Sequence, residues 1–134
     1  MTTHTQTLPR LDPHLIYGLD AIVSAAMGIA LLVTAEPLTQ LAGWTMPAGF
    51  LWTIGLLLLP WAAFNAWVAR TDRPAKAVVR GNIVGDIAWV VGSIALVLLQ
   101  ASSLSPIGLV LLAGQGIAVA GVLAIKLAGA RALA

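Results

Sequence analysis

The sequence contains no cysteine and few charged residues. Of its 134 residues, 9% are charged and 60% are hydrophobic. The absence of cysteine excludes disulfides, thiol chemistry and cysteine-ligated metal sites. Soluble domains usually contain about 25% charged residues, and a chain this short has little interior in which to bury so much apolar surface. The composition therefore favours a protein whose solvent is the lipid bilayer.

Other function classes are excluded or disfavoured by what the chain lacks. The formal net charge of +2 is too small to indicate nucleic-acid binding. The two histidines, His4 and His14, are not accompanied by a second histidine pair or an acidic cluster at metal-ligand spacing. No serine–histidine arrangement, HExxH motif or phosphate-binding glycine loop occurs within the apolar segments. We therefore expect no enzyme activity, no metal and no cofactor.

Four apolar segments divide the chain, each near the roughly 20 residues that cross about 30 Å of hydrocarbon. They cover approximately residues 15–35, 48–69, 78–99 and 107–127. Short pieces rich in proline, serine or charge separate them, including Glu36-Pro37 after the first. The prediction is an all-α integral membrane protein, a four-transmembrane-helix bundle with short connections. A polar cytoplasmic tail is expected over residues 1–14, and a short cytoplasmic C-terminus over residues 128–134.

Lysine and arginine predict how the helices are oriented. Arg10 precedes the first segment, Arg70, Arg73, Lys76 and Arg80 surround the second connection, and Lys126 and Arg131 follow the fourth segment. The first and third connections contain neither residue type. Because short loops rich in lysine and arginine remain in the cytoplasm, we expect a multi-pass protein of the bacterial inner (plasma) membrane. Its N-terminus and C-terminus are both predicted to be cytoplasmic.

Three of the four apolar segments carry a strongly polar residue at a similar depth. At about 1.5 Å of rise per residue, Asp20 lies on the order of 10 Å inside the cytoplasmic end of its helix. Asp86 lies at a comparable depth, Asn82 one turn shallower, and Asn65 returns to the same level. Because a carboxylate is costly in lipid, these side chains are expected to face each other. The predicted location is the cytoplasmic half of the bundle, between the first three helices.

Three further residues complete the candidates for ligand or proton binding. Arg80 is the expected cationic partner of the two acids, unless it extends to the headgroups. Trp89 shares a helical stripe with Asn82 and Asp86, so it could cover a ligand, although core packing is the alternative interpretation. Gln115, near the middle of the fourth segment, is better explained as a structural residue.

The segments "LLLLPWAAFNAWVAR", "VVRGNIVGDIAWVVGS" and "LLAGQGIAVAGV" together resemble the uncharacterised small four-helix inner-membrane proteins of bacteria. This resemblance covers residues 50–125 and implies a fold but no activity. The small multidrug-resistance transporters are a poorer match, because they carry a glutamate in the first helix where this chain has Asp20. The glutathione-dependent four-helix enzymes also match poorly, since "RGN" at residues 80–82 lacks their nearby glutamate pattern.

The sequence leaves three function classes, of which an integral-membrane enzyme ranks last because a nucleophile and a metal set are lacking. The other two concern the buried polar residues. The first is a non-enzymatic accessory or interaction module, in which the polar residues hold the helices together and the bundle binds a larger membrane complex or copies of itself. The second is a small proton- or cation-linked transporter or ligand-binding membrane protein that uses Asp20 and Asp86. A cavity between the two acids would favour the second function, whereas acids capped without a void would favour the first.

Overall fold

The protein is a bundle of four long helices joined by short connections. Its structure, a computed structural model, describes the backbone of residues 12–133 and the side chains of residues 12–130. The helices are α1 (Pro13–Ala42), α2 (Ala48–Arg70), α3 (Lys76–Gln100) and α4 (Pro106–Leu133). All four are long and apolar enough to cross a membrane, and the described residues contain no strand. The prediction of an all-α, four-helix membrane bundle is confirmed.

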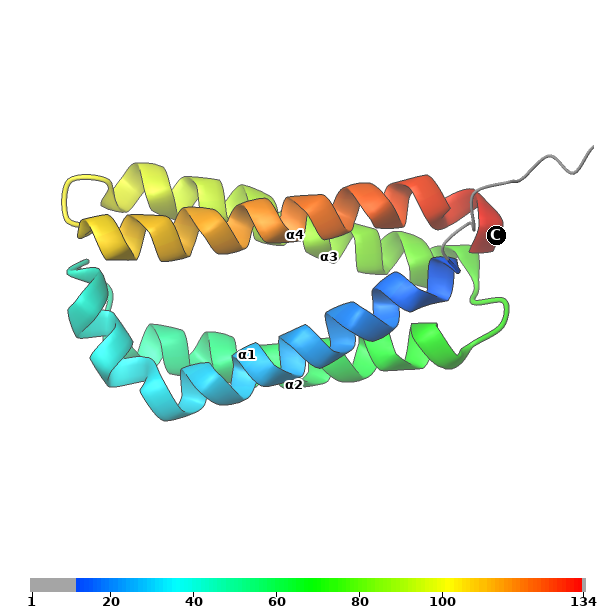
Figure 1. Cartoon of the computed structure of the whole chain (residues 1–134), viewed down its shortest axis with the longest axis horizontal. Helices are drawn as coiled ribbons and strands as arrows, with labels where there is room; N and C mark the ends of the chain where they lie inside the picture. The colour runs from blue at the N-terminus through cyan, green and yellow to red at the C-terminus, as the bar shows by residue number, and fades with distance from the viewer. Residues whose placement is uncertain (1–11, 134) are drawn as a thin grey trace, which may run out of the picture.

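The outer end of α1 differs from the expectation. The predicted break at Glu36-Pro37 is wrong, because α1 continues through Pro37 to Ala42. Proline is tolerated inside membrane helices. Beyond Pro37, the α3–α4 connection holds the end of α1. The backbone N–H of Ser105 donates to the carbonyl of Ala42 at 2.8 Å, and the Ser105 hydroxyl donates to the carbonyl of Leu41 at 2.7 Å. Figure 1 shows α1 bending in its cyan part.

The ends of the chain also differ in part from the expectation. The predicted tail over residues 1–14 lies largely outside the described residues, but Pro13 and His14 already belong to α1. The fourth helix does not end near residue 127, because α4 continues to Leu133. The helix therefore includes most of the segment that was expected to form a separate C-terminus. Lys126, which lies at the end of the predicted segment, is therefore followed by further helical residues.

Capping residues account for where α1 and α4 begin. The Asp12 carboxylate accepts a hydrogen bond from the backbone N–H of His14 at 2.9 Å, with Pro13 in the first turn. This hydrogen bond holds the pKa of the exposed Asp12 carboxyl below its usual range. At the start of α4, the Ser105 hydroxyl accepts from the backbone N–H of Gly108 at 3.0 Å. Both helices thus begin at a side chain that satisfies an otherwise free amide.

The chain forms two helical hairpins, α1–α2 and α3–α4, which Figure 1 shows lying against each other. Within the first hairpin, Gly28 and Gly55 face each other so closely that a Cβ on either would lie within 3 Å of the other's carbonyl oxygen. The hairpins meet where the end of α1 contacts Ser105 and Gly108, and again near the start of α1 and the end of α4. Their shared apolar core there consists of Tyr17, Val68, Val79 and Ile83.

Many large apolar side chains point outward from the bundle. Val33, Leu98, Leu99 and Ile117 are each more than 70% exposed. A soluble monomer rarely exposes so much apolar surface, whereas lipid tails solvate it without cost. The exposed surface therefore agrees with four helices immersed in a bilayer.

Candidate functional site

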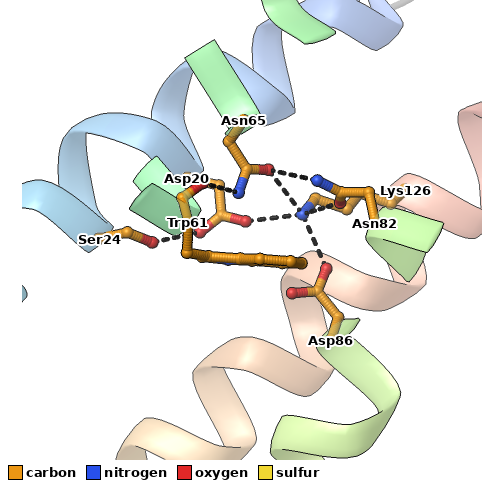
Figure 2. A network of polar contacts seen from close by, with 7 residues as sticks. All are labelled: Asp20, Ser24, Trp61, Asn65, Asn82, Asp86 and Lys126. Carbon is orange, nitrogen blue, oxygen red and sulfur yellow. Dashed lines mark hydrogen bonds and ion pairs between the residues drawn. The ribbon is translucent and has the colours of Figure 1, made fainter. Parts of the chain in front are cut away.

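The polar residues of the bundle converge on one buried lysine. Lys126, on α4, is 1% exposed. Its ammonium Nζ donates to Asp20 Oδ2 at 2.6 Å, Asp86 Oδ2 at 2.7 Å, Asn82 Oδ1 at 2.8 Å and Asn65 Oδ1 at 3.0 Å. We call these five residues the Lys126 cluster (Figure 2). Every helix of the bundle contributes to it, so the cluster joins all four helices at one point.

The four oxygens around the ammonium are charge-complementary and close. Charge-assisted N–H···O bonds usually measure about 2.7–2.9 Å, and the four distances span 2.6–3.0 Å. A lysine ammonium has three N–H donors, so four acceptors require at least one N–H to be shared. The ammonium is therefore saturated by protein oxygens. No further acceptor is needed to compensate its removal from water.

Three of the four acceptor side chains are also held by bonds that do not involve Lys126. The Ser24 hydroxyl donates to Asp20 Oδ1 at 2.9 Å. The Asn65 amide donates to the carbonyl of Trp61 at 3.0 Å, and the Asn82 amide donates to Asn65 Oδ1 at 3.2 Å. These bonds orient the two amides so that their carbonyl oxygens point at the lysine, as Figure 2 shows. The oxygen cage is thus largely built by α1, α2 and α3 themselves.

Two aromatic rings lie beside the ammonium. Lys126 Nζ is 4.9 Å from the centroid of the Tyr17 ring and 5.7 Å from that of the Trp61 ring, within the range of cation–π attraction. Trp61 reaches this position because Gly85 on α3 has no side chain there. A Cβ built on Gly85 would overlap the indole. The close approach of Gly85 and Trp61 therefore lets an aromatic ring cover the cluster.

The charges of the cluster do not balance. Lys126 forms ion pairs with both Asp20 and Asp86, so one ammonium faces two carboxylates. With all three groups ionised the cluster has one excess negative charge, and one bound proton or cation would neutralise it. Charged groups inside a membrane are costly unless they are paired. The arrangement can therefore hold the helices together, and it can also respond to a proton or a cation.

Four predicted site residues are brought together as the depth of each in its helix suggested: Asp20, Asn65, Asn82 and Asp86. The expectation that they lie between the first three helices is incomplete, because α4 contributes Lys126. Arg80 is not their cationic partner. Its side chain is exposed, whereas the lysine that was counted as a flanking charge is buried among the acids. The sequence signal for Lys126 is its position between apolar residues on both sides, in "VLAIKLAGA".

Trp89 and Gln115 are in contact with each other rather than with the Lys126 cluster. The Trp89 indole donates to Gln115 Oε1 at 2.7 Å. The Gln115 amide then donates to the Ser93 hydroxyl at 2.8 Å and to the carbonyl of Leu112 at 2.9 Å. These bonds join α3 to α4 farther along the bundle. Trp61, which the sequence did not indicate, occupies the covering position that had been considered for Trp89.

One cavity in the described part of the chain lies away from the Lys126 cluster. It measures about 300 Å³ and lies between α3 and α4. Its lining is almost entirely apolar and includes Val90, Ile94, Val97 and Ile117, with Ser93 at one side. The two acids therefore do not line this cavity. Within the described residues, no group of three or more histidine, cysteine or acidic side chains could hold a metal ion.

No family model, curated protein or solved structure matches this chain.

Proposed function

We propose that the protein is a non-enzymatic, multi-pass module of the bacterial inner membrane that acts by binding other membrane proteins or copies of itself. The observation that carries the proposal is the saturated Lys126 cluster. Both acids bind the lysine, and the amides fill the remaining directions around it. This arrangement is better suited to fixing the four helices to one another than to forming an open pathway for a substrate.

The outward face of α3 supports an interaction role. Gly81, Gly85, Ala88 and Gly92 follow one stripe of α3. Gly85 packs against Trp61 of the same chain, whereas the other three are exposed. A Cβ on Gly81 or Gly92 would meet nothing within 4 Å, so neither glycine serves the packing of its own chain. Small residues on a membrane helix let a second helix approach closely. We therefore place the binding face on this stripe.

The test of the interaction role replaces small residues of the stripe by a large one. Ala88→Leu and Gly92→Leu should weaken cross-linking to a partner or a second copy in native membranes while leaving the thermal stability of the monomer unchanged. Gly114→Leu is the matched control, because Gly114 is also exposed with open space at its Cβ but lies on α4. Equal cross-linking in all three variants and wild type would contradict the proposal.

The proposed orientation places both termini and the α2–α3 connection in the cytoplasm. Arg70, Arg73, Lys76 and Arg80 around this connection are all exposed, which supports the proposal through the positive-inside rule. The absence of cysteine makes single-cysteine labelling straightforward. Asp72→Cys should react with a membrane-impermeant maleimide only after cells are opened, and Ser102→Cys should react in intact spheroplasts. The reverse pattern would refute this orientation.

The charge imbalance of the cluster favours a second candidate, a small proton- or cation-linked transporter that uses Asp20 and Asp86. Purified protein in liposomes that contain a pH-sensitive dye distinguishes the two functions. If the protein is an interaction module, an imposed pH gradient should dissipate at the same rate as in protein-free liposomes. Faster dissipation that is lost in Asp20→Asn and Asp86→Asn, but retained in Asp72→Asn outside the helices, would establish the transporter instead.

A further inference from the structure

We infer that Asp20, Asn65, Asn82 and Asp86 form a recognition site for a primary ammonium group, and that Lys126 of the same chain is its built-in occupant. The inference goes beyond the proposed interaction role, and it requires neither a partner nor transport. The ligand class is a short alkylammonium ion that has three N–H donors and an apolar chain. The site belongs to the helices that surround the lysine rather than to α4, which supplies it.

The oxygen cage is built largely without the lysine that occupies it. All four oxygens come from α1, α2 and α3, whereas the ammonium comes from α4. Asp20, Asn65 and Asn82 each have a bond that persists without the lysine, to Ser24, to the carbonyl of Trp61 and between the two amides. Removal of the lysine side chain would therefore leave three of the four acceptors in place.

The groups that surround the ammonium also fit an organic ammonium ion. Two carboxylate and two amide oxygens supply directional acceptors at 2.6–3.0 Å. The rings of Tyr17 and Trp61 lie 4.9 Å and 5.7 Å from the nitrogen. Aromatic rings beside acceptors are a recurring way to bind organic ammonium ions. Tyr17 also belongs to an apolar core cluster with Val68, Val79 and Ile83, so the surroundings of the ring suit an alkyl chain.

The length of the ligand follows from covalent structure. Shortening Lys126 to alanine removes three carbons and the ammonium nitrogen, which together correspond to propylammonium. The Lys126→Ala variant therefore has a vacant cage of known size with two unpaired carboxylates. Propylammonium supplied from solution should reoccupy the cage and restore the lost contacts, because a ligand that binds only the folded state stabilises it.

The experiment measures the thermal unfolding of purified full-length protein in detergent at neutral pH and constant ionic strength. Propylammonium chloride should raise the Tm of Lys126→Ala by several degrees in a concentration-dependent manner. Tetramethylammonium, which has no N–H donor, and sodium should not. Wild type and Lys76→Ala, in which an exposed lysine is removed, should be unaffected by any of the three salts.

If Lys126→Ala folds, two results would overturn the inference. One is a folded Lys126→Ala protein whose Tm does not respond to propylammonium. The other is an equal response in wild type or Lys76→Ala, which would show a general effect of the amine. If Lys126→Ala does not fold, Lys126→Ala/Asp86→Asn retains a single carboxylate and should show the same selective response. If neither variant folds, propylammonium present during extraction should restore the yield of folded protein, and failure to do so also overturns the inference.

Discussion

Replacing Lys126 by methionine tests whether the cluster holds the bundle together. Methionine has nearly the length of lysine but neither charge nor donors, so the substitution removes the ammonium without leaving a large void. It breaks four hydrogen bonds at once, two of them ion pairs with Asp20 and Asp86. The side chains of these acids are only 13% and 4% exposed. Both carboxylates therefore lose their counter-ion in an environment that contains little water.

The expected loss of stability is large for this reason. Removing one partner of a buried ion pair costs about 3–5 kcal/mol, chiefly because the other charge is left buried and unpaired. Asp20 keeps its bond from Ser24 at 2.9 Å, which reduces its share of the loss. The structure provides no second hydrogen bond for Asp86 among the described residues. We expect Lys126→Met to lower the free energy of unfolding by about 4 kcal/mol.

Neutralising the acids should reverse most of this loss. In Asp20→Asn/Asp86→Asn/Lys126→Met no buried charge is left unpaired, and replacing a whole buried ionic group is often close to neutral. The triple variant should therefore recover to within about 1–2 kcal/mol of wild type. This recovery separates the cost of unpaired charge from any cost of repacking around the methionine.

The assay is reversible unfolding in mixed detergent–SDS micelles, followed by the far-ultraviolet circular dichroism of the helices. Lys76→Met is the matched control, because Lys76 is exposed at the start of α3. A free energy of unfolding for Lys126→Met within about 1 kcal/mol of this control would refute the reasoning, because a surface substitution costs that little. A triple variant less stable than Lys126→Met would likewise show that unpaired charge is not the cause.

Three further substitutions test the packing and capping of the helices. Gly85→Ala places a Cβ into the Trp61 ring, so it should lower the free energy of unfolding by about 1–3 kcal/mol and change the tryptophan emission. The control Gly92→Ala, with open space at its Cβ, should change neither. Gly28→Ala brings a Cβ to 2.9 Å from a backbone carbonyl of α2 and should lower the Tm of the bundle, which a thermal melt would show; an unchanged Tm would mean that the hairpin separates freely. Ser105→Ala removes the cap of α4 and should cost about 1 kcal/mol in chemical unfolding, and an unaltered midpoint would contradict the capping role.

The amount and arrangement of apolar sequence were enough to predict the fold. Four segments of bilayer length cannot bury themselves in so short a chain, so membrane helices were the remaining solution. Boundaries were predictable only where the sequence changes sharply, as at Ala48. Pro37 misled the prediction because a proline usually ends a helix in water but is tolerated inside a membrane helix, and α1 continues past it to Ala42.

The sequence by itself determined that Asp20, Asn65, Asn82 and Asp86 would meet, because helical rise fixes the depth of each residue and lipid excludes unpaired charge. It did not determine which cation they would meet. Arg80 and Lys126 both lie near the ends of apolar segments, where a long basic side chain can either extend to the headgroups or turn inward. Only the tertiary structure decided between them, because the packing of the α3–α4 hairpin against α1–α2 turns Lys126 toward the acids and leaves Arg80 exposed.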